Sequence, residues 1–253
     1  MKDTSSSASW FARPKPNAHA KLRLFCFPFA GGGALIYRTW PFTLPPEIEV
    51  FAAQLPGRSN RLKETPYTDL TALTDAVAEN ILPYLDRPFA FFGHSMGAMI
   101  SFELARNLRR RGSPQPVHLL VSGRRAPQLG DSQRPMHDLP EPEFIEELGS
   151  LDGTPPEVLA HPELMRLMIP LLRADFSVVE TYRYEPDAPL DCRITALGGL
   201  QDAHVTRPQL EAWQEQTTAS CNVRMLPGNH FFLQTEQPLL LRLVTRELQS
   251  HIL

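Results

Sequence analysis

The chain has 253 residues, with 25 basic and 28 acidic side chains and a formal net charge of −3 at pH 7. This length is enough for a single α/β domain with a sizeable core, and the charge balance gives no reason to expect a nucleic-acid or anionic-membrane partner. The three cysteines, at unpatterned spacing, indicate neither a disulfide framework nor a metal site.

The N-terminal segment over residues 1–20 is polar and lacks the apolar core of a signal peptide. We expect a disordered tail over 1–20, followed by one domain over 21–253. No later stretch has the length of apolar sequence that a membrane span requires. We therefore expect a cytoplasmic protein without a membrane partner, and a monomer by default.

Beyond this tail, apolar strand-like runs alternate with amphipathic segments of helical spacing. The expected strands cover residues 22–29, 48–55, 89–92, 117–122, 192–197 and 222–226, and the expected helices cover residues 69–85, 96–111 and 236–249. Such alternation predicts a mainly parallel central sheet with helices on both faces.

One long region interrupts the alternation. Residues 125–186 contain no convincing strand but several helical pieces separated by prolines, over 142–148, 161–169 and 170–182. Pro170 is expected to start or kink a helix because it cannot donate a hydrogen bond to the preceding turn. We interpret this region as a helical lid over the active site. An ordinary helical layer packed on the sheet is the alternative.

The pentapeptide Gly93-His94-Ser95-Met96-Gly97 has the pattern G-x-S-x-G. It follows the apolar run 89–92 and opens an amphipathic segment, which is the strand, turn and helix context of a nucleophile elbow. Glycine suits the neighbours of a strained serine because it has no Cβ atom. The pattern therefore predicts that Ser95 is the nucleophile of a serine hydrolase.

A serine hydroxyl needs a base, and the base needs a carboxylate to hold its tautomer. His230 lies in a loop between the last strand and the last helix, where hydrolases with such an elbow place their base. Asp202 follows the strand over 192–197, so acid and base occur in the expected order after Ser95. We predict the triad Ser95, Asp202 and His230, with Asp175 as the alternative acid.

Two further histidines lie close to these residues in the sequence. We expect His94 to be structural, because it is held beside Ser95 with its side chain directed away. We expect His204 to be a poor geometric match for the base, because it follows Asp202 by only two residues.

A glycine-rich loop, Phe27-Pro-Phe-Ala-Gly-Gly-Gly33, follows the first predicted strand. The backbone N–H of Ala30 in this loop and that of Met96 are the expected oxyanion donors, and losing one such donor typically costs about 10²–10³ in rate. A nucleotide site is the alternative. It is disfavoured because no Lys-Ser/Thr pair follows Gly33 and the spacing is not G-x-G-x-x-G.

Several motifs in order resemble the type II thioesterases, the discrete editing enzymes of polyketide and nonribosomal peptide synthases. They are Phe27-Pro-Phe-Ala-Gly-Gly, Gln54-Leu-Pro-Gly-Arg58, Phe92-Gly-His-Ser-Met-Gly97, Leu172-Arg-Ala-Asp-Phe176 and Gly228-Asn-His-Phe-Phe232. The resemblance runs from about Lys21 to the end of the chain. Asn229 departs from it, because a glycine or an acidic residue is common at that position.

The resemblance implies an α/β-hydrolase fold with a helical lid and the same triad of Ser95, Asp202 and His230. It implies a serine thioesterase that hydrolyses aberrant or stalled acyl groups from the phosphopantetheine arm of acyl or peptidyl carrier proteins. No separate cofactor is then expected, because phosphopantetheine is part of the substrate. The partners would be these carrier proteins.

The substrate channel is expected to run under the lid. Apolar lid residues would line the acyl pocket, and we name Met136, Leu164, Met168 and Phe176 for this role. Carrier proteins are usually acidic, so Arg58 and Arg61 are candidates for long-range steering of the substrate. The alternatives for both arginines are ordinary surface charge or bonding to carbonyl groups in the loop after Leu55.

Three other functions remain open from the sequence. A general carboxylesterase or lipase would use the same triad and a lid. A thioesterase domain cut from a synthase is disfavoured by the initial methionine and the lack of carrier sequence. A binding protein on a hydrolase fold is disfavoured by an intact triad.

Overall fold

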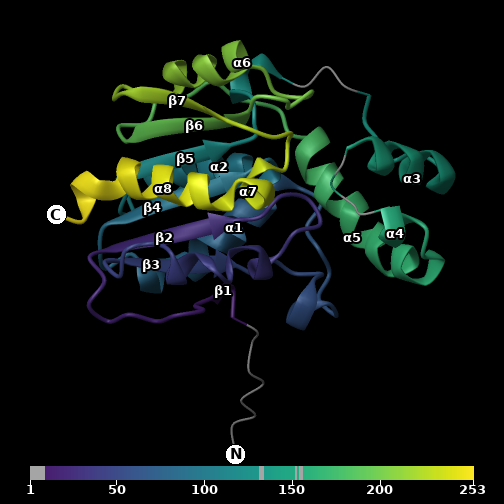
Figure 1. The fold of residues 1–253 in the computed structure, drawn as a ribbon, viewed down its shortest axis with the longest axis horizontal. Helices are drawn as coiled ribbons and strands as arrows, with labels where there is room; N and C mark the ends of the chain where they lie inside the picture. The colour runs from purple at the N-terminus through teal and green to yellow at the C-terminus, as the bar shows by residue number, and fades with distance from the viewer. Residues whose placement is uncertain (1–8, 131–133, 152, 154–155) are drawn as a thin grey trace, which may run out of the picture.

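The computed structural model describes residues 9–130, 134–151, 153 and 156–253. Within these residues, a seven-stranded sheet of order β1-β3-β2-β4-β5-β6-β7 forms the centre of the molecule (Figure 1). Its strands are β1 (Phe11–Ala12), β2 (Leu22–Phe27), β3 (Ile48–Ala53), β4 (Phe89–His94), β5 (His118–Ser122), β6 (Arg193–Gly199) and β7 (Cys221–Leu226). Only the short β1 runs antiparallel to its neighbour, so the sheet is mainly parallel, as predicted.

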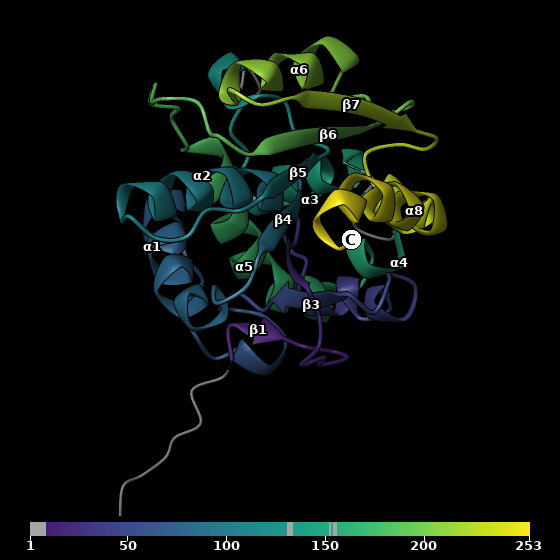
Figure 2. The same cartoon turned by 90° about the vertical axis from the view of Figure 1, so that its left-hand side faces the viewer.

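Helices cover both faces of this sheet. The α-helices are α1 (Leu70–Ile81), α2 (Met96–Arg110), α3 (Glu141–Ser150), α4 (Pro156–Leu159), α5 (Pro162–Glu180), α6 (Arg207–Glu211), α7 (Phe232–Thr235) and α8 (Gln237–Leu248). In Figure 2, α1 and α2 lie on one side of the strands and α8 lies on the other. The α/β architecture with two helical layers is therefore confirmed.

The apolar strands are explained by this double cover. Every residue of β2, β3, β4 and β5 is buried. Because side chains alternate along a strand, Phe25 and Phe27 join a hydrophobic cluster with α1 and α2, whereas Leu24 and Cys26 join a second cluster with α8. A strand buried on both faces reads as a continuous apolar run, and the sequence shows this pattern.

The topology places a crevice between β2 and β4. The chain passes from β2 to β3 on one side and then returns to β4 on the other side of β2. The loops that follow β2 and β4 therefore lead away from each other at the carboxyl ends of the strands. In open parallel sheets, this switch point is where ligands bind.

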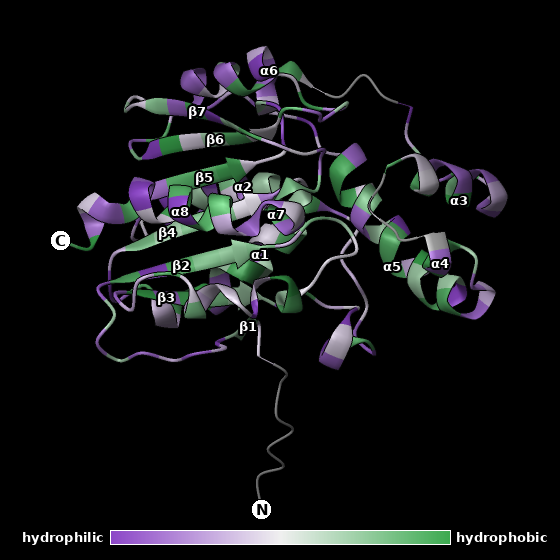
Figure 3. Cartoon of the chain, viewed as in Figure 1, coloured by the Kyte–Doolittle hydropathy of each residue, from purple (hydrophilic) through white to green (hydrophobic). Residues whose placement is uncertain are grey.

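The helices α3, α4 and α5 lie together beyond these carboxyl ends (Figure 1). They contain a small hydrophobic cluster of their own, around Phe144, Met165 and Leu172. In Figure 3 the central strands β2 and β5 are coloured mainly as hydrophobic, whereas these helices mix hydrophobic and hydrophilic residues. An amphipathic layer of this kind can pack inward on one side and face solvent on the other.

The structure differs from the sequence prediction in two places. Residues 162–180 form one helix that contains Pro170, and no new helix starts at this proline. Its buried residues lie on both sides of Pro170, at Ile169 and Leu172, so packing maintains the helix through the proline. Residues 9–20 do not form a free tail. Phe11 is buried and β1 pairs with β3, whereas residues 1–8 lie outside the described part.

No helix in the described part of the chain is long and apolar enough to cross a membrane.

Candidate active site

Ser95 occupies a strained turn between β4 and α2. Its backbone angles are φ 53° and ψ −112°, a region that non-glycine residues rarely adopt. A Cβ atom on Gly93 would lie 2.0 Å from the carbonyl oxygen of Gly97, and one on Gly97 would lie 2.0 Å from that of Phe27. Both glycines are therefore required by close backbone contacts, as a nucleophile elbow needs.

Asp202 and His230 form a hydrogen-bonded pair at the ends of β6 and β7. The carboxylate oxygen Oδ2 of Asp202 lies 2.8 Å from Nδ1 of His230. The other oxygen, Oδ1, accepts the backbone N–H groups of His204 at 2.8 Å and Val205 at 3.2 Å. These bonds fix the carboxylate, and the pairing at Nδ1 leaves Nε2 of His230 as the nitrogen that can accept a proton.

The environment keeps Asp202 ionised. Burial on its own would raise the pKa of this carboxyl, but the hydrogen bond to His230 and the two backbone N–H bonds outweigh it. The pKa of Asp202 is therefore held below its ordinary value. A carboxylate can then stabilise the imidazolium that forms when His230 takes a proton.

Two other imidazole rings flank His230. The His94 ring centre lies 5.1 Å from that of His230, and the His204 ring centre lies at 5.9 Å. His94 is fully buried, with Nδ1 2.9 Å from Oγ of Ser122. Burial, followed by the nearby His230, holds the pKa of His94 well below its usual value, so the ring stays neutral.

A structural role for His94 agrees with this burial. His204 was set aside from the sequence as a base, yet its side chain lines the cavity beside His230. The signal that could have placed it there is its position just after Asp202, in the loop at the carboxyl end of β6.

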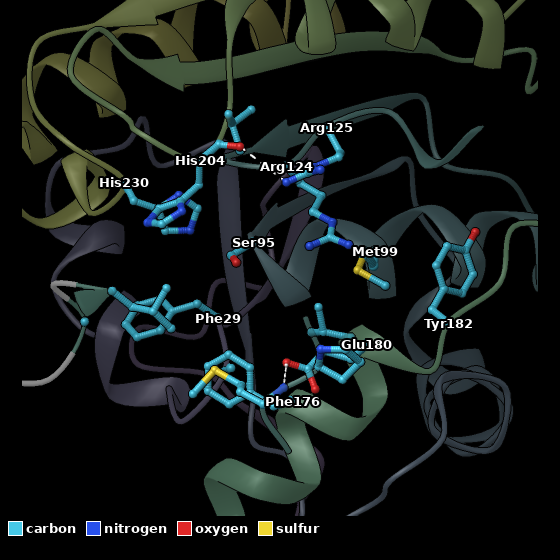
Figure 4. A pocket seen from close by; sticks show the side chains of 18 of the residues that line it. Phe29, Ser95, Met99, Arg124, Arg125, Phe176, Glu180, Tyr182, His204 and His230 are labelled. Atoms are coloured by element: carbon cyan, nitrogen blue, oxygen red, sulfur yellow. Dashed lines mark hydrogen bonds between the residues drawn. The ribbon is translucent and has the colours of Figure 1, made fainter. Parts of the chain in front are cut away.

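A cavity of about 750 Å³ lies between the sheet and the helices α3 and α5, and both Ser95 and His230 line it. In Figure 4, Ser95 lies between His230 on one side and Met99 on the other, with Phe176 and Glu180 on the α5 side. Most of the wall is apolar. It includes Phe29, Met99, Phe102, Met136, Leu139, Leu172, Phe176, Tyr182, Tyr184 and Trp213.

Only half of the predicted acyl-pocket residues reach this cavity. Met136 and Phe176 line it, whereas Leu164 and Met168 do not. Leu164 is 42% exposed on the outer side of α5, and Met168 packs against the small hydrophobic cluster of α3, α4 and α5. Sequence reasoning missed Met99, Phe102 and Trp213, because their place in the wall depends on how α2 and the segment after α6 pack.

The two expected oxyanion donors are positioned differently. Ala30 lies in the glycine-rich loop after β2 and lines the cavity. Met96 is the first residue of α2, where backbone N–H groups have no partner within the helix. As oxyanion donors, the N–H of Met96 would approach the region next to Ser95 from the N-terminal end of α2, and the N–H of Ala30 would approach it from the loop after β2.

Arg58 and Arg61 are not at the surface. Arg58 is 6% exposed and binds Asp175 and the carbonyl oxygen of Gly32. Arg61 is 5% exposed and binds the carbonyl oxygen of Gln54 and the carboxylate of Glu64. Neither lines the cavity, so the structure does not bring these two arginines to the site. Both are bonded within the protein. Arg58 Nε also donates to the carbonyl oxygen of Pro56 at 3.3 Å, in the loop after Leu55, whereas the carbonyl that Arg61 binds, that of Gln54, lies before this loop.

Asp175, the alternative acid from the sequence, does not pair with His230. It belongs to α5 and is bound to Arg58 and to the backbone N–H of Gly31. The carboxylate that pairs with His230 is that of Asp202. Among the described residues, no group of three or more histidine, cysteine or acidic side chains could hold a metal ion.

Comparisons with known proteins find similar proteins along most of the chain. A family model described as a thioesterase domain matches residues 22–248. The gramicidin S biosynthesis protein GrsT of Aneurinibacillus migulanus is 50% identical over 240 residues, which cover 95% of this chain and 94% of GrsT.

Two further relatives extend the comparison. A protein of Brevibacillus parabrevis, named linear gramicidin dehydrogenase LgrE, is 48% identical and covers 98% of this chain and 95% of its own length. The solved structure of the type II thioesterase BorB from the borrelidin biosynthetic cluster superposes with a TM-score of 0.86 at 35% identity. The match covers 96% of this chain and 98% of BorB.

Proposed function

The chain belongs to the thioesterase family and is a thioester hydrolase, and from this premise we propose that its substrates are acyl groups on carrier proteins. It would release aberrant or stalled acyl groups from the phosphopantetheine arm in polyketide or nonribosomal peptide assembly. Relatives named for gramicidin S and borrelidin biosynthesis support this assignment. The observation that carries it is that His230, hydrogen-bonded to the buried carboxylate of Asp202, lines the same cavity as Ser95.

The proposed reaction has two steps. Ser95 Oγ attacks the thioester carbonyl while Nε2 of His230 takes its proton, and the N–H groups of Ala30 and Met96 stabilise the oxyanion. The C–S bond then breaks, and the thiol leaves with the proton from His230. In the second step, His230 activates a water that attacks the acyl-serine ester, which releases the carboxylic acid and restores Ser95.

The cavity suits an acyl group of substantial size. Its volume of about 750 Å³ falls in the usual range for small-molecule sites, and its aromatic and aliphatic wall favours apolar acyl chains. Met99 and Met136 give this wall adaptable side chains. We propose α3, α4 and α5 as a lid over this cavity. We also propose that the protein acts as a cytoplasmic monomer and needs no separate cofactor.

The name of one relative raises dehydrogenase activity as a second candidate. A nicotinamide dinucleotide would need glycine-rich backbone to hold its pyrophosphate. Here the N–H of Gly31 is donated to the buried carboxylate of Asp175, so it is not available to a pyrophosphate. Incubation with NADH or NADPH and a thioester should produce acid without oxidation of the nicotinamide.

Mass spectrometry of carrier proteins tests the proposal. Carriers loaded with acetyl, hexanoyl or aminoacyl groups should lose them when the wild-type enzyme is added and keep them with Ser95→Ala. Carboxyl esters of matched chain length provide the control, because a general esterase would prefer them. Higher kcat/KM on the esters than on the carrier thioesters would contradict the proposal.

A further inference from the structure

A buried ion pair connects α5 to the glycine-rich loop. Asp175 is 2% exposed and Arg58 is 6% exposed. The guanidinium of Arg58 donates to both carboxylate oxygens of Asp175, from Nη1 to Oδ2 at 2.9 Å and from Nη2 to Oδ1 at 2.7 Å. This is the paired geometry in which an arginine and a carboxylate bind most strongly.

The same two side chains also hold the backbone of the loop after β2. Oδ2 of Asp175 accepts the N–H of Gly31 at 2.7 Å, and Nη1 of Arg58 donates to the carbonyl oxygen of Gly32 at 2.7 Å. Arg58 is fixed in turn by Gln54, whose Nε2 donates to the Arg58 carbonyl oxygen at 3.0 Å. The ion pair is therefore one part of a network that binds the peptide group before Gly31 and the peptide group after Gly32.

The loop held in this way is a tight turn. The N–H of Gly32 donates to the carbonyl oxygen of Phe29 at 2.9 Å, and Gly31 has φ +78°. A positive φ at the third position is the signature of a type II turn. A type I turn would orient the middle peptide, which contains the Gly31 N–H, in the opposite direction. Asp175 accepts this N–H and so selects the type II form.

This turn contains the proposed oxyanion donor. The N–H of Ala30 belongs to the same peptide group as the carbonyl oxygen of Phe29, which accepts the hydrogen bond that closes the turn. Fixing the turn therefore fixes the direction of the Ala30 N–H. Close packing reinforces this, because a Cβ atom on Gly31 would lie 2.7 Å from Cδ2 of Leu172 on α5.

Building on the proposed function, we propose that Asp175 and Arg58 are positioning residues for catalysis. Asp175 holds the turn that directs the Ala30 N–H at the oxyanion. Arg58 neutralises a carboxylate that would otherwise lie unpaired, close to a developing negative charge. The lid helix α5 thereby supplies part of the support for the oxyanion hole, in addition to a wall of the cavity.

The proposal predicts an ordered set of kinetic effects on a small substrate, the hexanoyl thioester of N-acetylcysteamine. Asp175→Ala removes the acceptor for the Gly31 N–H and should lower kcat by about 100-fold, as loss of one oxyanion donor does. KM should change by less than about threefold, because the donor acts on the oxyanion rather than on the bound thioester. Asp175→Asn keeps an acceptor oxygen and should lose less than about tenfold.

Arg58 provides an independent comparison. Arg58→Met leaves the Asp175 carboxylate unpaired and should lower kcat by about 10–100-fold. Adding Asp175→Asn to Arg58→Met removes that charge, so the double variant should recover most of the lost kcat. A purely structural pair would change Tm in these variants but leave the kcat of the folded enzyme unchanged. If Arg58→Met or Asp175→Ala fails to fold, Arg58→Lys and Asp175→Asn carry the same comparison at smaller amplitude.

Glu49→Gln is the matched control. Glu49 is 1% exposed and binds Arg13 with a single carboxylate oxygen, so this variant also removes a buried charge, but outside the cavity. Its kcat should stay within about twofold of wild type, even if its Tm falls as far as that of Asp175→Asn. A trifluoromethyl ketone, which forms a tetrahedral adduct with serine, should lose affinity in Asp175→Ala in parallel with kcat.

Two outcomes would overturn the positioning role. One is a kcat for Asp175→Ala within threefold of wild type, and the other is an equal loss in Glu49→Gln. Failure of the wild-type enzyme on carrier-bound thioesters, with the small thioester still hydrolysed, would instead contradict the proposed function. The two failures are therefore distinguishable.

Discussion

The two halves of α5 differ in how they are attached. We call the sheet with its covering helices and the glycine-rich loop the body of the molecule. Residues 171–180 are attached to this body: Asp175 holds the glycine-rich loop, Val178 belongs to the main hydrophobic cluster, and Ser177 Oγ donates to the carbonyl oxygen of Thr68. Residues 162–169 instead pack only in the small cluster with α3 and α4, which Leu172 and Phe176 of the second half also join. On their outer side, Leu164 and Leu167 are 42% and 66% exposed.

This difference shows that one helix can serve two mechanical roles. The C-terminal half is anchored by a buried ion pair and by the main core, so it forms a fixed wall of the cavity. The N-terminal half is held by fewer buried contacts, and such regions open at lower free-energy cost than the core. We expect movement of the lid, where it occurs, to involve α3, α4 and the part of α5 before Pro170.

The largest expected effect comes from removing the proposed nucleophile of the body, a change that leaves both halves of α5 unchanged. Ser95→Ala should lower kcat/KM on a small thioester by about 10⁴-fold or more, because the covalent step is lost. Steady-state kinetics provide the measurement. The proteolysis pattern of the lid should match that of wild type. Substantial remaining hydrolysis would contradict the role of Ser95 as nucleophile.

A pair of phenylalanine variants compares the body directly with the lid. Phe91→Ala in β4 should lower the global free energy of unfolding by about 3–5 kcal/mol, because it opens a cavity in the main core. Phe144→Ala in α3 removes a fully buried ring, whose centre lies 6.1 Å from the ring centre of Phe176. This variant should mainly expose the lid region to proteases.

The two measurements for this pair are urea unfolding and limited proteolysis under native conditions. Phe144→Ala should speed cleavage between residues 134 and 169 with a smaller change in global unfolding. If it lowers the global free energy of unfolding as much as Phe91→Ala does, the lid and the body unfold as one unit. That result would contradict the difference proposed between them.

Low pH should reduce the free energy of unfolding through His118. This residue is 1% exposed in β5, and its Nε2 lies 2.9 Å from Oγ1 of Thr195. Burial lowers the pKa of His118 from 6.5 to about 4. The unfolded chain therefore binds a proton at His118 more readily than the folded protein does. The contribution of His118 to the free energy of unfolding is fully present above pH 6.5 and is lost as the pH falls toward 4. The shift sets the loss at up to about 3 kcal/mol.

Unfolding free energies at pH 7 and pH 4.5 check this effect. His118→Gln removes the titrating group, so its stability should fall less over this interval than that of wild type. Equal losses in the two proteins would show that His118 does not contribute.

The smallest effect is expected on the outer side of the lid. Leu167→Gln should change stability by less than about 0.5 kcal/mol, because the side chain is largely exposed. Hydrolysis of a small thioester should also be unchanged. A Tm shift of several degrees would show that residues 162–169 are held more firmly than their packing indicates.

The sequence by itself determined the parts of this protein that follow local rules. Continuous apolar runs indicated strands buried on both faces, and G-x-S-x-G marked the elbow, because each pattern is complete within a few consecutive residues. The order of motifs also predicted the family, which the match over residues 22–248 confirms. The predicted acid and base, Asp202 and His230, do form a hydrogen bond in the structure.

Only the tertiary structure decided the features that depend on packing between distant segments. It buried Arg58 and Arg61, joined Asp175 to the glycine-rich loop, and brought Met99 and Trp213 rather than Leu164 and Met168 to the cavity. It also kept α5 continuous through Pro170. Whether Arg58, Leu164 or Trp213 reaches the cavity depends on which distant segments pack against it, and the residues next to it in the sequence do not determine that packing.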